Sequence, residues 1–127
     1  MANAFSLTSM RAGDRHRIYL TATGDMDSAA FVDGYIVAMN DLGEPWRFDR
    51  VIDLTACEGH VEFDDFVRLG KYWAPLMHFA NGPVKTAVVT LNPRTEGRMP
   101  VVAMLLEGHH IKSFQDLAAA DAWLDEA

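Results

Sequence analysis

Hydrophobic and polar residues follow two different periods along this chain, and short turn signals separate the segments. Short apolar or alternating runs predict strands over 17–23, 48–54, 84–91 and 110–114. A weaker alternation over 5–10 predicts one more strand. The turn Ala12-Gly13-Asp14 should join it to the following strand as a hairpin.

Longer segments with apolar residues three or four positions apart predict helices between these strands. The first begins after Asp25 or Asp27, since either carboxylate can accept from the free amides of a first turn, and it ends at Gly43. The longest covers 63–80, with a kink at Pro75, and carries an apolar stripe that turns Trp73 inward.

The last third of the chain has a less regular pattern. We expect a polar loop over 92–99 and then a short helix over 101–107, with Pro100 in its first turn. Ser113 and Asp116 are spaced as a capping box for a final helix that carries Leu117 and Leu124.

The predicted order of elements is β-β-α-β-α-β-α-β-α. Strands that alternate with helices imply right-handed crossovers and a mostly parallel sheet, because a helical connection returns the chain to the same end of the sheet. The first strand should be antiparallel and lie at an edge, because its connection is short. With 127 residues, we expect a single α/β domain over 1–127.

Composition narrows the classes of partner. Eleven basic and eighteen acidic residues give a net charge of −7 without a run of lysine or arginine, which argues against nucleic acid and anionic membranes as partners. One cysteine excludes an internal disulfide. No apolar run reaches the length of a membrane span, and residues 1–12 do not resemble a signal peptide, so we expect a cytoplasmic protein.

Several local runs, taken in order, resemble one fold family. They are Val51-Ile52-Asp53-Leu54, the stretch from Phe66 to Trp73, Ala87-Val88-Val89, and Phe114-Gln115-Asp116-Leu117 followed by Ala122-Trp123-Leu124. In this order and spacing they resemble the small stand-alone bacterial members of the SpoIIAA-like fold, which STAS regulators share with CRAL-TRIO lipid-binding proteins. The resemblance implies a five-stranded sheet in a right-handed β-α superhelix, with sequential strands as neighbours.

The regulatory switch of the STAS proteins does not carry over to this chain. In that family a serine is phosphorylated where the loop after the Asp53-type strand enters the next helix. The matching residues here are Val61, Glu62 and Phe63, and no serine or threonine occurs from Gly59 to Phe66.

Polar residues follow the second, third and fourth predicted strands, at the edge where open parallel sheets usually bind ligands. The predicted ligand-binding residues come after the last two of these strands. Thr55 and His60 follow the third strand, and Arg94, Thr95 and Arg98 follow the fourth. Arginines beside the start of a helix can hold an anion, because the free amides and the helix dipole add to their charge. These five residues are the predicted ligand-binding set. The alternative is three solvated loops with ordinary polar residues.

Catalytic and metal-binding interpretations are weaker. Cys57 with His60 as its base could act as a nucleophile, but a lone cysteine at the end of a buried strand is more often a core residue with an ordinary or raised thiol pKa. His109 and His110 begin the last strand, where solvated or capping histidines are expected. They lie at the opposite end of the sheet from Cys57 and His60, so the two pairs cannot share one ion, and a site of His78, His109 and His110 is the remaining metal alternative. We therefore predict no catalytic residue, metal or cofactor.

Three functions follow, in order of preference. The first is a non-enzymatic regulatory or binding domain that recognises a protein partner, which could be a second copy of the chain, or a small ligand. The second is a carrier of a small amphipathic or lipid-like anionic ligand. The third is an enzyme that uses Cys57, His60, Arg94 and Arg98. A long pocket lined by methionine and phenylalanine would favour the carrier. A flat exposed apolar patch without a pocket would favour the protein partner, and a Cys57 thiolate within hydrogen-bond reach of His60 would favour the enzyme.

Overall fold

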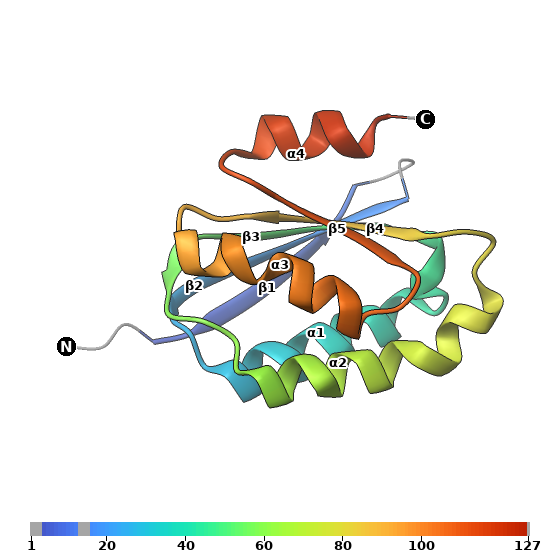
Figure 1. Cartoon of the computed structure of the whole chain (residues 1–127), viewed down its shortest axis with the longest axis horizontal. Coiled ribbons are helices and arrows are strands. Elements are labelled where there is room, and N and C mark those ends of the chain that lie inside the picture. The colour runs from blue at the N-terminus through green and yellow to red at the C-terminus, as the bar shows by residue number, and fades with distance from the viewer. Residues whose placement is uncertain (1–3, 13–15, 127) are drawn as a thin grey trace.

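The computed structural model describes residues 4–12 and 16–126, which form a five-stranded sheet with helices on both faces (Figure 1). The strands are β1 (Ser6–Arg11), β2 (Arg17–Asp25), β3 (Asp49–Glu58), β4 (Val84–Val89) and β5 (His109–Phe114). The helices are α1 (Ser28–Leu42), α2 (Phe63–Leu76), α3 (Pro93–Leu105) and α4 (Leu117–Leu124). The predicted order of elements is confirmed.

The strands lie in the sheet in the order in which they occur in the chain. β1 pairs with β2 in the antiparallel sense and lies at an edge, and β2 to β5 are parallel. The register places Val51 beside Ala87 and Ile52 beside Val88, and these four residues are buried. The predicted mixed sheet and its adjacent buried parallel strands are therefore confirmed.

Three helices cover one face of the sheet and one helix covers the other. α1, α2 and α3 lie on the same side, and α4 lies alone on the opposite side (Figure 1). This follows from the strand order, because successive crossovers of one handedness that all move in the same direction leave their helices on one face. The face under α1 to α3 is where helices can enclose a cavity.

Each face has its own apolar core. Under α1 to α3, Leu20, Val32 and Met39 pack with Trp73, which is only 1% exposed, so the inward orientation predicted for this ring is confirmed. Under α4, the core is formed by Val51, Ala87, Val89, Ala120 and Leu124. Residues of β3 and β4 alternate between these two cores, as the two-residue period of a strand requires.

The ends of α1 follow the sequence signals. Asp27 caps the helix by accepting from the Ala30 amide at 3.1 Å, which selects between the two predicted caps. Gly43 ends it with φ at 80°, a conformation that favours glycine. The turn predicted at 12–14 lies partly outside the described residues, because the structure describes Ala12 but not residues 13–15.

Helix α2 is shorter than predicted. It ends at Leu76, one residue beyond Pro75, and a 3₁₀ turn over Met77–Phe79 follows in place of a kinked helix that continues to residue 80. Proline removes one amide from the hydrogen-bond ladder, so here it ends the helix. Gly70 brings α2 against the end of α3, because a Cβ atom at this position would lie 2.5 Å from the Leu105 carbonyl oxygen.

The prediction for residues 92–107 is correct that a helix is present but wrong about where it begins. The expected loop is the first half of α3, which begins at Pro93 and not near Pro100. Asn92 caps the helix by accepting from the Arg94 amide at 3.0 Å. Pro100 lies inside the helix, where the carbonyl that loses its donor belongs to the exposed Glu96 and can bind water.

Other boundaries and one cap also differ from the prediction. β4 ends at Val89 instead of residue 91. β3 continues to Glu58, because β2 also extends and pairs with it from Thr23 to Asp25 after a shift in register. Asp116, and not a Ser113–Asp116 capping box, caps α4 by accepting from the Ala119 amide at 2.8 Å. No helix in the described residues is long and apolar enough to cross a membrane.

Candidate functional site

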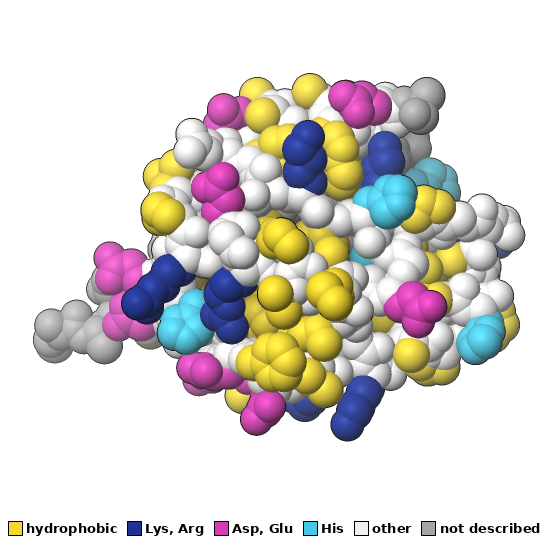
Figure 2. Space-filling model, viewed as in Figure 1, with side chains coloured by type: hydrophobic (Ala, Val, Ile, Leu, Met, Phe, Trp, Pro, Cys, Tyr) yellow, Lys and Arg dark blue, Asp and Glu magenta, His cyan; other side chains and the backbone are white. Residues whose placement is uncertain are grey.

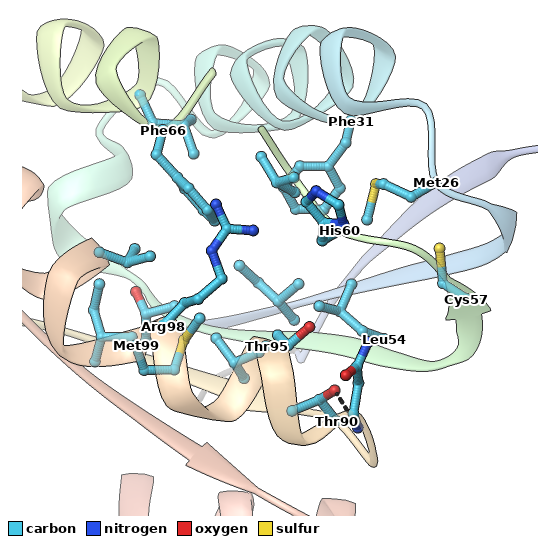
Figure 3. Close-up of a pocket in the computed structure, with 18 of the residues that line it drawn as sticks. Met26, Phe31, Leu54, Cys57, His60, Phe66, Thr90, Thr95, Arg98 and Met99 are labelled. Carbon is cyan, nitrogen blue, oxygen red and sulfur yellow. Dashed lines mark hydrogen bonds between the residues drawn. The ribbon is translucent and has the colours of Figure 1, made fainter. Parts of the chain in front are cut away.

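A cavity of about 60 Å³ lies between the sheet and helices α1, α2 and α3 (Figure 3). Its floor comes from alternate residues of adjacent strands, Ile52 and Leu54 of β3, Thr86 and Val88 of β4, and Thr90 directly after β4. Thr86 and Thr90 are four residues apart, so the floor extends over roughly 13 Å at about 3.3 Å per residue.

Most of the cavity wall is apolar. Methionine and phenylalanine side chains contribute from several elements, and Figure 3 shows Met26, Phe31, Phe66 and Met99 around the same space. A water molecule needs about 10–15 Å³ of cavity volume measured in this way. The cavity therefore has room for a small organic molecule but not for a long lipid chain. The lining residues are of the types expected of a carrier, whereas the cavity is small and not the long pocket expected for one from the sequence.

The outer part of the cavity carries basic and polar groups. Arg98 extends from α3 toward α2, and its guanidinium carbon lies 5.7 Å from the centre of the Phe66 ring. His60 comes from the segment between β3 and α2, and its Nε2 lies 3.5 Å from Glu62 Oε1. We call Arg98, His60 and Thr95 the rim of the cavity. Figure 2 shows basic and histidine side chains next to exposed hydrophobic ones in this region.

The rim segment between β3 and α2 is held against the start of α1. The Met26 amide donates to the Glu58 carbonyl at 2.7 Å, and the Glu62 amide donates to Ser28 Oγ at 2.7 Å. Ser28 in turn donates to Asp65 at 2.5 Å, and this hydrogen bond lowers the pKa of that carboxyl. These contacts fix the backbone on both sides of His60.

The inner end of the cavity is polar as well. Tyr35 and Thr86 line it and are 3% and 5% exposed. Trp73 Nε1 donates to Tyr35 Oη at 2.9 Å, and Arg50 Nε donates to Thr86 Oγ1 at 3.2 Å. Burial raises the pKa of the Tyr35 phenol, against the opposing effect of the Arg50 charge, so this hydroxyl keeps its proton.

Arg50 is a fully buried cation behind this end. Its Nη1 donates to the Phe48 carbonyl at 3.1 Å, and its guanidinium carbon lies 4.6 Å from the centre of the Trp73 ring. Within the described residues its Nη2 has no hydrogen-bond partner and it makes no ion pair with a carboxylate. Burial lowers the pKa of the guanidinium, against the opposing effect of the nearby Asp49 charge.

His109 lies beside Arg50 and Trp73, and the prediction of a solvated or capping histidine is wrong for it. It is 6% exposed, its ring centre lies 4.6 Å from that of Trp73, and neither ring nitrogen has a hydrogen-bond partner in the described residues. Burial, aided by the charge of Arg50, lowers the pKa of His109 to about 3, so the ring is neutral. Across the described residues no group of histidine, cysteine and carboxylate side chains could hold a metal ion.

The structure brings together three of the five predicted ligand-binding residues. His60, Thr95 and Arg98 line the cavity. Arg94 is exposed on α3 and does not line it, because the helix begins at Pro93 and turns this side chain away. Thr55 belongs to β3 instead of a loop, and its hydroxyl donates to Asp53 Oδ1 at 2.7 Å.

The pair of residues considered for nucleophilic catalysis is not assembled as such a mechanism requires. The Cys57 thiol lies 3.8 Å from the Glu58 carbonyl oxygen, and no hydrogen bond joins it to His60, although the structure describes both side chains. Burial raises the pKa of the Cys57 thiol, and the charges of Asp25 and Glu58 add to this effect. The raised pKa agrees with the prediction and disfavours the thiolate.

Sequence reasoning missed the polar residues at the inner end, namely Tyr35, Arg50, Thr86 and His109. One signal was present. Arg50 has the same parity as Ile52 and Leu54, so the strand period placed a charge on the face of the core. The groups that surround it come from α1, α2, β4 and β5, and their proximity depends on the tertiary structure.

The comparisons with known proteins bear on the fold. A solved structure of an uncharacterised protein of the DUF3478 family from Shewanella loihica PV-4, described as having a SpoIIAA-like fold, is 17% identical in sequence. It superposes with a TM-score of 0.60 over 96% of this chain and 94% of that chain. No protein-family model and no curated protein matches the chain. The structural likeness extends over nearly the whole chain, and the protein therefore has the SpoIIAA-like fold.

Proposed function

We propose that this protein is a binding domain for a small amphipathic molecule with an apolar body and an anionic head group. The observation that carries the proposal is the cavity under α1 to α3, whose walls are mostly apolar and whose rim holds Arg98. An apolar ligand body gains free energy by leaving water, roughly 25 cal/mol for each Å² of apolar surface buried. The head group then needs a cation at the rim.

Arg98 is suited to that role. The protein carries eighteen carboxylates, yet Arg98 makes no ion pair in the described part of the chain and rests over the Phe66 ring instead. A guanidinium above an aromatic ring retains hydrogen-bond donors for an anion, and a charge-assisted hydrogen bond contributes about 1.5–3 kcal/mol. His60 and Thr95 supply further polar groups beside it.

The proposal narrows the preferred function to one kind of partner. A binding or regulatory role remains, with a small ligand as the species recognised. The cavity favours a small ligand over a protein partner. A protein partner would need only a flat apolar surface and would not require a cavity inside the domain. Among the enzymatic alternatives, the Cys57 and His60 arrangement lacks the hydrogen bond that would activate the thiol.

A titration of saturated carboxylates from butanoate to decanoate, followed by amide chemical shifts, tests this function. We expect saturable binding with an optimum among the shorter chains, because the cavity is small. The neutral alcohol 1-hexanol should bind at least about tenfold more weakly than hexanoate, since it lacks the charge that Arg98 would contact.

Two variants distinguish a direct contact with Arg98 from the general effect of removing one positive charge. Arg98→Gln should weaken hexanoate binding about tenfold, because it removes a charge-assisted contact. Arg94→Gln removes the same charge from an exposed position of the same helix and should change the affinity less than about twofold. Equal losses for the two variants, or no saturable binding by any acid, would contradict the proposal.

A further inference from the structure

The inner end of the cavity offers hydrogen-bond donors that the protein does not use. Tyr35 Oη accepts from Trp73 Nε1, and Thr86 Oγ1 accepts from Arg50 Nε, so each oxygen already serves as an acceptor. Each hydroxyl still carries its own proton. Among the described residues we find no acceptor for either proton, although both side chains are more than nine-tenths buried. A buried donor without a partner is costly unless something else completes the hydrogen bond.

Arg50 makes this end electrically positive. It is fully buried, no carboxylate in the described residues pairs with it, and its Nη2 has no hydrogen-bond partner. Its donation to Thr86 polarises that hydroxyl and strengthens it as a donor, because hydrogen bonds in a chain reinforce one another.

We propose that the Tyr35 and Thr86 hydroxyls bind a neutral hydrogen-bond acceptor of the ligand, so that the ligand is a short carboxylic acid with a carbonyl or ether oxygen toward its far end. This rests on the proposed function, since the carboxylate occupies the rim. The far group is an acceptor because both protein oxygens already accept and a positive charge lies behind them. It is neutral because Arg50 does not line the cavity and would not contact a carboxylate directly.

The inference makes the cavity selective at both ends. A saturated acid would satisfy Arg98 at the rim and leave two hydroxyl donors facing methylene groups. An oxo acid of suitable length would satisfy both ends. If the inner end had no available donors, the saturated acid would bind more tightly than the oxo acid. Burying a carbonyl without a hydrogen bond reduces affinity at least about fivefold.

The test compares each saturated acid with the oxo acid of the same chain length. The probes are pentanoate with 4-oxopentanoate, hexanoate with 5-oxohexanoate and heptanoate with 6-oxoheptanoate, each titrated against the wild-type protein by amide chemical shifts. We expect the oxo acid to bind at least about threefold more tightly in one or more of the three pairs. Oxo acids that bind more weakly than, or equally with, their parents at every length would overturn the inference.

A pair of substitutions at Thr86 assigns the preference to the hydroxyl. Thr86→Val keeps the shape and removes the donor, and Thr86→Ser keeps the donor. The preference for the oxo acid should disappear in Thr86→Val and persist in Thr86→Ser. A preference that survives in Thr86→Val would contradict the role of Thr86. If Thr86→Val does not fold, the comparison of acid pairs in the wild-type protein decides the question.

The outcomes separate this inference from the function on which it rests. Saturated acids that bind in the cavity while every oxo acid binds more weakly would overturn the inference and leave the proposed function intact. The absence of binding by any acid would overturn both.

Discussion

Two buried arginines lie on neighbouring strands, on opposite faces of the sheet, in opposite electrostatic surroundings. Arg17 of β2, on the face of α4, is 4% exposed and contacts Asp121 at 3.0 Å and Asp125 at 2.8 Å. Arg50 of β3, on the face of α1 to α3, is fully buried and contacts neutral groups only. The first charge is neutralised by the helix that covers it, and the second is not.

The difference assigns the two arginines different roles. Arg17 attaches a helix to the sheet, whereas Arg50 lies behind the cavity. Asp121 accepts from both Arg17 and Tyr19, and these hydrogen bonds attach α4 to the sheet. The buried charge of Arg17 therefore has a structural role. Arg50 makes no ion pair of this kind in the described residues, and the nearby charge of Asp49 only partly offsets the cost of its burial. Its position behind the inner end of the cavity is the reason that we connect it with ligand binding.

The largest expected effect concerns the aromatic rings on the two faces. Trp73→Ala should reduce the free energy of unfolding by about 3–5 kcal/mol, because the buried ring packs against Arg50 and donates to Tyr35. Trp123→Ala, on α4, should cost about half as much, since that ring is only half-buried. Urea unfolding measures both. A loss below about 1 kcal/mol for Trp73→Ala would mean that the ring is not part of the core.

The arginines themselves should respond differently to replacement by methionine. Arg17→Met should cost about 1.5–3 kcal/mol of unfolding free energy, because it removes two charge-assisted hydrogen bonds. Arg50→Met should change stability by less than about 1 kcal/mol, because the lost hydrogen bonds are offset by removing a buried charge that has no counter-ion. The same urea titrations apply, and a greater loss for Arg50→Met than for Arg17→Met would contradict the comparison.

A smaller effect should appear in the pH dependence of the free energy of unfolding, through His109, which lies beside Arg50. The unfolded chain binds a proton at His109 below about pH 6.5, whereas the folded protein does so only near pH 3. The unfolded state therefore binds more protons in this interval. Stability should fall by about 1.4 kcal/mol for each pH unit as the pH decreases from about 6.5 toward 3.

Replacement of the two adjacent histidines isolates this effect. Chemical unfolding at pH 6 and pH 5 should show the full decrease in wild type and in His110→Leu, because His110 is exposed. His109→Leu should lack the contribution. An unchanged pH dependence in His109→Leu would show that His109 is not held neutral by burial.

The fold was predictable because local signals agreed with one another. Alternating periods and the Asp27 and Gly43 signals each depend on a few adjacent residues, and the sequential parallel sheet follows from them. The start of α3 was not predictable by the same means. Pro93 and Pro100 are equally good first-turn residues, and the choice depends on the Asn92 cap and on the exposure of Glu96, whose carbonyl loses its donor to Pro100.

The site was predictable only at its rim. His60, Thr95 and Arg98 follow strands that end at the same edge, so sequence position and sheet topology suffice to bring them near one another. The inner end required tertiary information, because a charged residue such as Arg50 is normally expected at the surface. Only the structure shows that Trp73, Thr86 and His109 surround it.

The central claim is that the cavity binds an amphipathic acid with its apolar body against the floor. The most direct measurement is a set of isotope-filtered NOEs between unlabelled hexanoate and the methyl groups of the labelled protein. We predict NOEs from the methylene groups to Ile52, Val88 and Val102, which line the cavity. NOEs confined to exposed methyl groups of α3, such as those of Val101 and Met104, would contradict the account, because they would place the acid on the surface of the protein.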